Sequence, residues 1–258
     1  MSGVETLTLA TAAGLAGVIN AVAGGGTLVT FPALLLFGTP ALVANATSTL
    51  ALVLGTGGSI YGFRQQHAAV REWLARFIPV SLLGGLLGSI LLTNTDEAVF
   101  SRLVPFLIFF ATLLFVAQGA FRRFATGGET AGASTGRRAV GIAVLFQFGV
   151  AVYGGYFGAG IGILMLASLG FIGLTDIHEM NALKNILGSL INFVAAAWFI
   201  ASGLIDWPRA AVMTAGALVG YYAGARYSQS IPQPRVRLLI TVIGFTISAL
   251  MFYRQFAR

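Results

Sequence analysis

The chain has 258 residues, of which 57% are hydrophobic and only 9% are charged. An average soluble domain carries about 25% charged residues, and so few charges cannot cover a water-exposed surface. This composition excludes an ordinary soluble protein and predicts an all-α polytopic membrane protein. The net charge is +7, and basic residues placed between apolar runs are typical of cytoplasmic loops rather than of a nucleic-acid interface.

Cysteine is absent, and histidine occurs only at His67 and His178. Disulfides and thiolate metal sites are therefore excluded, and a histidine-based metal centre has almost no ligands to use. We expect no metal, no cofactor and no enzymatic activity. An intramembrane enzyme, the rival class, would need a nucleophile–base pair or metal ligands, and neither histidine lies in mid-span.

The N-terminus lacks a basic region, so its apolar segment is predicted to be a first helix rather than a cleaved signal. This segment runs from Leu7 to Phe37, with Gly24, Gly25 and Gly26 inside it. As one straight helix it would measure roughly 45–50 Å, which exceeds the hydrocarbon core of about 30 Å. Glycines interrupt a helix at small steric cost, so we expect a helix, a break and a shorter helix.

Three uninterrupted spans are predicted next, at Ala46–Phe63, Phe77–Leu92 and Val99–Phe121. The loop Arg64–Arg76 is rich in arginine and is expected in the cytoplasm. The turn Thr93–Glu97 contains no Lys or Arg and is expected outside.

A polar linker, residues 122–138, separates the two halves of the chain. Its interior reads Thr-Gly-Gly-Glu-Thr-Ala-Gly-Ala-Ser-Thr-Gly, which is a flexible composition, and flanking arginines predict a cytoplasmic location. Residues 1–121 are predicted to form a first transmembrane repeat, and residues 139–258 a second.

The second half starts with another long segment, Ala139–Ile172, interrupted by Gly158, Ala159 and Gly160. Three spans follow, at Ala182–Gly203, Ala210–Ala225 and Leu238–Tyr253. The glycine clusters of the two halves match, and the dipeptide Asn-Ala follows each of them, at positions 45 and 181. The halves are therefore predicted to be internal repeats, each a Gly-broken segment followed by three transmembrane helices.

The relative orientation of the repeats depends on the broken segments. If each enters and leaves by one side, the halves are inverted and both termini lie outside. If each crosses once, the halves are parallel and both termini lie inside, and the arginine count does not separate the two. We favour inversion, because the segments are too long for one pass and broken helices in inverted repeats form known transporter sites.

Polar residues mark the span that follows each break. They are Asn45, Thr49 and Thr56 in the first half, and Asn181, Lys184, Asn185 and Asn192 in the second. Steps of three, four and seven keep them near one helical face. Buried amides and hydroxyls are unfavourable in lipid without partners, so this face is expected to line the bundle interior or a wet cavity.

Lys184 is the only lysine in the chain and lies inside an apolar span. Intramembrane charges are rare and usually functional, although a lysine near a helix start can also extend to the headgroups. Helices that begin at the glycine breaks would present backbone N–H groups and a positive dipole end to an anion. The alternative is that the glycines only permit close helix packing, which we expect for Gly84, Gly88, Gly216, Gly220 and Gly224.

Asp176, His178 and Glu179 form a small titratable cluster before Asn181. A proton relay is one interpretation of the cluster. Acidic residues before a helix more often interact with its N-terminus, and we expect that role here.

Several motifs occur in a fixed order. Gly14-Leu-Ala-Gly17, Ala23-Gly-Gly-Gly26 with Pro32, and Asn45-Ala-Thr47-Ser-Thr49 resemble the first repeat of the TauE/SafE sulfite exporter family. Residues Gly154 to Gly162 and Asn181-Ala-Leu-Lys184-Asn185 resemble its second repeat. The resemblance covers Gly14 to Arg254 and implies multi-pass secondary transport of sulfite, sulfonates or related organosulfur anions across the bacterial inner membrane. Lys184 stands where such second repeats often carry a polar or basic residue.

We therefore expect a secondary transporter of small anions that works by alternating access around a central site. No ATP-binding motif occurs, so ion gradients, including protons, or the substrate gradient would drive transport. A passive anion channel is the alternative. Such a channel would need a continuous pore lined with polar residues. The expected substrate-binding residues are Gly24, Gly25, Gly26, Asn45, Thr49, Gly158, Ala159, Gly160, Asn181, Lys184 and Asn185.

Overall fold

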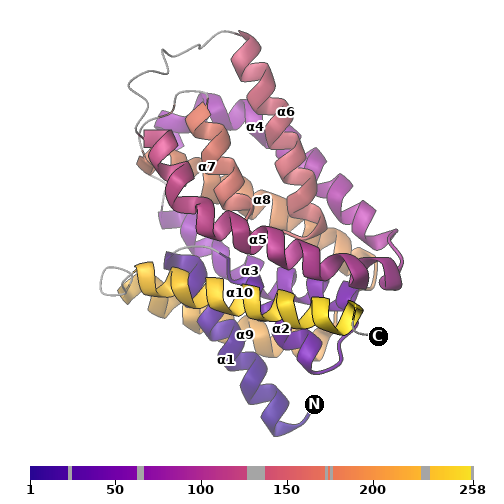
Figure 1. Ribbon diagram of the computed structural model, residues 1–258. Coiled ribbons are helices and arrows are strands. Elements are labelled where there is room, and N and C mark those ends of the chain that lie inside the picture. The colour runs from indigo at the N-terminus through magenta and orange to yellow at the C-terminus, as the bar shows by residue number, and fades with distance from the viewer. Residues whose placement is uncertain are drawn as a thin grey trace.

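The computed structural model describes residues 1–22, 25–62, 67–126, 137–171, 174, 177–227 and 233–256. These residues form ten α-helices and no strand, so the expected all-helical class is confirmed (Figure 1). In chain order the helices are α1 (Gly3–Val22), α2 (Thr27–Leu36), α3 (Ala41–Gly62), α4 (His67–Thr93), α5 (Glu97–Thr126), α6 (Arg137–Tyr156), α7 (Ile161–Phe171), α8 (Ile177–Ala201), α9 (Trp207–Tyr227) and α10 (Gln233–Phe256).

Four helices in the described part of the chain are long and apolar enough to cross a membrane. Their qualifying stretches are Gly3–Ala21, Val70–Thr93, Glu97–Ala117 and Ala182–Ala201. Shorter apolar helices lie at Thr27–Leu36, Ala41–Gly55, Val140–Tyr156 and Ile240–Phe256. Large apolar side chains such as Leu145 and Val219 stay exposed on the outside of the bundle, where lipid can cover them. Helix length and surface together indicate a multi-pass membrane protein.

Both expected helix breaks are present. Helix α1 ends at Val22 and α2 begins at Thr27, while α6 ends at Tyr156 and α7 begins at Ile161. Positive backbone φ angles occur in both breaks, at Gly25 (92°), Gly158 (80°) and Gly160 (79°). Glycine enters this region without the steric cost that a Cβ imposes, so these positions explain why the helices stop here. Gly24 lies outside the described residues.

The connections differ in detail from the expected boundaries. The turn between α4 and α5 lies where it was predicted, between Thr93 and Glu97. Helix α5 continues to Thr126 and α6 begins at Arg137, so both ends of the expected linker are helical. The linker interior, residues 127–136, lies outside the described residues, as does Asp176. Glu179 lies in the first turn of α8, where a carboxylate favourably meets the helix dipole.

Two closely packed helix pairs form the sides of the bundle. In the pair α1–α9, a Cβ on Gly220 would overlap the carbonyl oxygen of Gly14, and a Cβ on Gly216 would overlap that of Ala10. The same relation holds in the pair α4–α6, where Gly88 packs directly on Val152. The expected packing role of these glycines is confirmed, and both pairs consist of helices that run in the same direction.

Helices α3 and α9 also run in the same direction. The backbone N–H of Asp206, just before α9, donates to the Thr47 hydroxyl over 3.1 Å, and further along Gly55 packs beneath the Tyr221 ring. Helix α2 runs the opposite way to α3, because Leu36 and Ala41 meet at the short turn between them, while Thr30, earlier in α2, shares a 2.6 Å hydrogen bond with Ser48, later in α3. Since α1, α9 and α3 share one direction, α2 turns back along α1 after the first break.

Helices α4 and α8 form a second pair of like direction. Gly85 packs on Ile191, and two turns later the indole N–H of Trp198 donates to the Thr93 hydroxyl over 3.1 Å. Helices α4 and α8 are therefore parallel, as α3 and α9 are.

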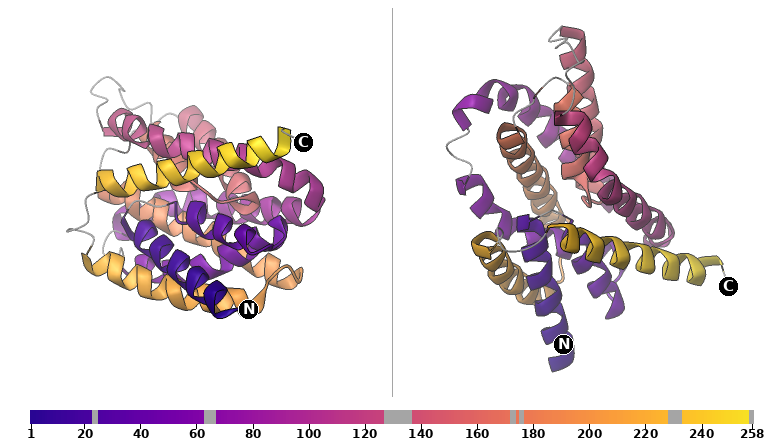
Figure 2. Two further views of the ribbon diagram at one scale, coloured as in Figure 1. Left: turned by 60° about the horizontal axis from the view of Figure 1, so that its bottom comes forward. Right: turned by 60° about the vertical axis from the view of Figure 1, so that its left-hand side comes forward.

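Helices α5 and α10 lie alongside each other in opposite directions (Figures 1 and 2). The Phe106 ring meets Phe252 with centroids 4.8 Å apart, and one turn later the Phe109 ring meets Phe245 at 5.8 Å. Residue numbers rise along α5 as they fall along α10, which fixes the antiparallel arrangement.

Polar contacts tie together the ends of helices at one edge of the bundle. The Glu97 carboxylate at the start of α5 accepts hydrogen bonds from the backbone N–H groups of Ala41 (2.5 Å) and Leu42 (3.0 Å) at the start of α3. At the start of α9, Arg209 binds Asp206 and reaches the Glu5 carboxylate of α1 at 2.6 Å. Hydrogen bonding to Asp206 raises the pKa of Arg209.

Candidate functional site

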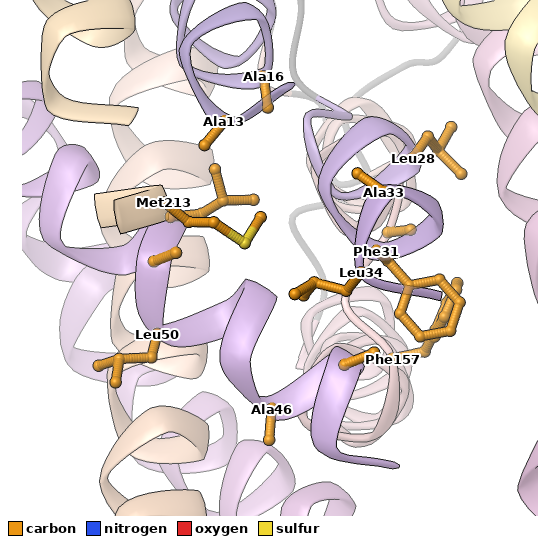
Figure 3. Close-up of a cluster of buried hydrophobic side chains, with 14 of the residues drawn as sticks. Ala13, Ala16, Leu28, Phe31, Ala33, Leu34, Ala46, Leu50, Phe157 and Met213 are labelled. Atoms are coloured by element: carbon orange, nitrogen blue, oxygen red, sulfur yellow. The ribbon is translucent and has the colours of Figure 1, made fainter. Parts of the chain in front are cut away.

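The two helix breaks meet inside the bundle at one turn of α5. A Cβ on Gly25 would overlap the Phe115 ring, and a Cβ on Gly160 would lie 3.5 Å from Leu114. The second break also touches α2, because the ring of Phe31 in α2 packs edge-on against Phe157, with centroids 5.5 Å apart (Figure 3). Two segments more than a hundred residues apart in sequence therefore share one buried location.

A cavity of about 140 Å³ lies where the breaks meet. Both breaks contribute to its lining, together with residues from α1, α3, α5, α8 and α9. Its apolar wall includes Phe115, Phe157 and Leu166. The polar side chains that line it are Asn20, Thr27, Thr49, Lys184, Asn185, Ser189, Asn192 and Tyr221. The cavity is smaller than the pockets of roughly 300–1,000 Å³ that hold drug-sized ligands, so its size suits a small solute.

Six of the expected site residues line this cavity. They are Gly25, Thr49, Gly158, Gly160, Lys184 and Asn185. Gly24 and the side chain of Asn181 lie outside the described residues. The polar residues that were expected on one face of α3 and one face of α8 thus lie around one cavity in the fold.

Gly26, Asn45 and Ala159 do not line the cavity but lie in the backbone framework behind it. The N–H of Gly26 donates to the Asn20 side-chain oxygen over 2.7 Å, and the Ala159 carbonyl accepts from the Tyr153 hydroxyl over 2.8 Å. Asn45 is 1% exposed and donates from its side chain to the carbonyl of Tyr156. In this structure these residues hold the two breaks in shape.

Lys184 approaches the cavity along α7. Its aliphatic stem packs on Gly162, where an added Cβ would lie 3.1 Å from the Lys184 Cδ. Gly162 thus leaves room for the lysine stem, and the half-buried Lys184 is part of the cavity lining.

Helix starts contribute to the electrostatics of the cavity. Helix α2 begins at Thr27 and α7 begins at Ile161, and both residues line the cavity. Each helix start carries a partial positive charge. The described lining of the cavity contains no aspartate or glutamate. The Thr49 hydroxyl donates to the Asn45 carbonyl over 2.9 Å in this structure, so it must rotate away from that carbonyl before it can donate to an anion.

Sequence reasoning missed several lining residues. Asn20 and Thr27 flank the first break, and a polar side chain four residues before the start of the sequence cluster Gly24–Gly26 was a signal that could have been used. Asn192 belonged to the expected polar face of α8 but was not included among the site residues. Tyr221 lies in α9, far along the chain, and nothing in its local sequence marks it.

Comparison with known proteins gives a consistent result. Residues 9–251 match the profile of the family described as Sulfite exporter TauE/SafE. A probable membrane transporter protein of Haemophilus influenzae is 30% identical over 256 residues, which cover 98% of this chain and 97% of that protein. Probable membrane transporter protein ORF9 of Sinorhizobium sp and probable membrane transporter protein YfcA of Escherichia coli K12 are each 27% identical, covering 92% and 93% of this chain and 88% and 86% of their own. No solved structure matches the chain.

Proposed function

This chain belongs to the sulfite exporter TauE/SafE family, and on that premise we propose that it is a secondary transporter of small anions such as sulfite, sulfonates or other organosulfur compounds. Membership of a transporter family argues against an enzyme. The bilayer would be the bacterial inner membrane, in keeping with the bacterial relatives described as membrane transporters.

The observation that carries the anion proposal is the charge around the cavity. Lys184 and the starts of α2 and α7 contribute positive charge, and the described lining contains no carboxylate. Amides and hydroxyls from α1, α3, α8 and α9 add hydrogen-bonding groups. An anion that leaves water needs such compensation, since burying an unpaired charge costs a great deal of free energy. We expect the anion to bind between the breaks, on Gly25, Thr49, Gly158, Gly160, Lys184 and Asn185.

Helix directions support an inverted-repeat architecture. If each broken segment crossed once and the halves were parallel, α5 and α10 would run the same way and α3 would oppose α9. The contacts give the reverse, with α5 antiparallel to α10 and α3 parallel to α9. The return of α2 along α1 agrees with a broken segment that enters and leaves by one side. Both termini would then lie outside, and residues 122–138 in the cytoplasm.

An inverted-repeat architecture supports an alternating-access mechanism. Inverted repeats allow one half to move relative to the other, so that a central site opens to each side in turn. The breaks would act together, because both rest on the same turn of α5. Gradients of protons or other ions, or of the anion itself, would drive the cycle.

The test is transport by purified protein in liposomes. We expect saturable sulfite uptake that is accelerated by unlabelled sulfite inside the vesicles, because exchange is characteristic of a carrier. Uptake that never saturates and shows no exchange would indicate the passive channel instead. Absence of both uptake and binding for sulfite, sulfonates and thiosulfate would reject the anion proposal.

Lys184 gives the proposal a residue-level test. A hydrogen bond between charged groups contributes about 1.5–3 kcal/mol, so Lys184→Gln should weaken sulfite binding roughly 10- to 150-fold. Lys184→Arg should be intermediate, since arginine keeps the charge but changes the shape and hydration of the head. Unchanged affinity in Lys184→Gln, measured by calorimetry on the folded variant, would remove Lys184 from the site.

A further inference from the structure

A hydrogen-bonded chain connects the first break to Tyr221. The backbone N–H of Gly26 donates to Oδ1 of Asn20 over 2.7 Å, and Nδ2 of Asn20 donates to the Tyr221 hydroxyl oxygen over 2.9 Å. Asn20 and Tyr221 both line the cavity, although they lie in α1 and α9. The three residues thus link a helix start, an amide and a phenol at one wall of the candidate site.

The orientation of the Asn20 amide is fixed by chemistry. A backbone N–H can only donate, so the Asn20 atom that faces Gly26 must be the side-chain oxygen. The amide nitrogen then faces Tyr221, and a neutral amide nitrogen can only donate. The Tyr221 oxygen is therefore an acceptor in this contact, and its own proton is not used there.

The packing of the ring limits where that proton can go. A Cβ on Gly55 would overlap the Tyr221 ring, so the ring is seated on the bare backbone of α3 and has little freedom. Tyr221 is 8% exposed, and no group in the described part of the chain accepts a hydrogen bond from its hydroxyl. The open space that Tyr221 touches is the cavity.

We propose that the Tyr221 hydroxyl donates a hydrogen bond to the transported anion, and that Asn20 is the positioning residue that keeps its proton available. This inference rests on the proposed function. Lys184 would then donate beside the second break and Tyr221 beside the first, so the anion would meet one side-chain donor next to each break.

Tyr221→Phe tests the donor directly, with sulfite as the probe and calorimetry on purified protein as the measurement. The ring and its packing on Gly55 are retained, and Asn20, which loses the Tyr221 oxygen as acceptor, lines the cavity where water can replace it, so the melting temperature should change little. Sulfite affinity should fall by roughly 10- to 150-fold, the range for a hydrogen bond to a charged group. Tyr222→Phe is the matched control, because Tyr222 is the next residue, is 68% exposed and bonds only to Arg226 among the described residues.

Asn20→Asp tests the positioning role through a double-mutant cycle. An aspartate can still accept from Gly26, but its second oxygen would accept the Tyr221 proton and draw it away from the cavity. Asn20→Asp should therefore weaken sulfite binding, partly through its charge. Adding Tyr221→Phe to Asn20→Asp should cost less than about threefold more, since the phenol proton is already diverted. Independent, multiplying losses would overturn the positioning role.

The outcomes separate this inference from the function on which it rests. If wild-type protein binds no anion, the transport proposal fails and the inference falls with it. If wild type binds sulfite and Lys184→Gln weakens binding while Tyr221→Phe does not, only the inference is overturned. Equal losses in Tyr221→Phe and Tyr222→Phe would also overturn it, because they would indicate a general effect on α9.

Discussion

The side-chain amide of Asn45 donates a hydrogen bond to the backbone carbonyl of Tyr156 across 3.0 Å. Tyr156 is the last residue of α6, and the final carbonyls of a helix have no partner within it. A residue of α3 in the first half thus completes the helix end at the break in the second half. The predicted polar face of α3 therefore has two roles. Thr49 lines the cavity, and Asn45 holds the backbone at the second break.

Asn45→Ala should destabilise the protein by about 1–3 kcal/mol, because the half-buried Tyr156 carbonyl would lose its partner. Chemical denaturation in mild detergent, followed by circular dichroism, would measure the change. Thr11→Ala is the control, since Thr11 is an exposed helical hydroxyl whose loss should matter by less than about 0.5 kcal/mol. A variant that keeps full stability but loses sulfite binding would instead make Asn45 a ligand-binding residue.

Gly25→Ala should impair anion binding more than Gly149→Ala. The Gly25 backbone has φ of 92°, where a Cβ costs of order 1–3 kcal/mol, and the new methyl would displace the Phe115 ring from the cavity wall. Nothing lies within 4 Å of a Cβ on Gly149, so the same chemical change is harmless there. Calorimetry with sulfite compares the two variants. Equal affinities would mean that the shape of the first break does not matter for binding.

Glu97→Ala should destabilise the protein by about 0.5–2 kcal/mol, the range for loss of a helix cap. Its carboxylate satisfies the free N–H groups of Ala41 and Leu42 at the start of α3, a contact between α5 and α3 that fixes the turn after α2. Glu72→Ala removes an exposed ion pair with Arg76 and should cost almost nothing. Thermal unfolding curves of the two variants provide the measurement, and equal shifts would contradict the capping role.

The inverted topology predicts which sites react with a membrane-impermeant thiol reagent. The chain has no cysteine, so single substitutions can be labelled without background. Gly3→Cys and Gln255→Cys should react from outside intact cells, whereas Ser134→Cys, in the linker, should react only after the membrane is opened. Labelling of both terminal positions from the cytoplasmic side alone would reject inversion and favour the parallel arrangement.

The sequence predicted both helix breaks correctly, and the reason is local. Glycine clusters inside apolar runs too long for one span give a helix interruption whatever surrounds them, as Gly25, Gly158 and Gly160 illustrate. The polar residues Thr49, Lys184 and Asn185 were also recognisable, because an amide or a charge within an apolar span must find a polar environment. The helical class, both breaks and three of the eight polar side chains that line the cavity were thus available from the sequence.

What only the tertiary structure decided is which chain segments meet. Asn20 and Tyr221 are separated by 201 residues, and they touch because small residues let α1 and α9 approach at backbone distance. Periodicity shows which face of a helix is buried but not which helix covers it, so Tyr221 could not be assigned to the cavity. For the same reason Asn45 was expected to face a ligand. Its position on the polar face of α3 was predictable, whereas its partner, the Tyr156 carbonyl, depends on how α6 ends beside it.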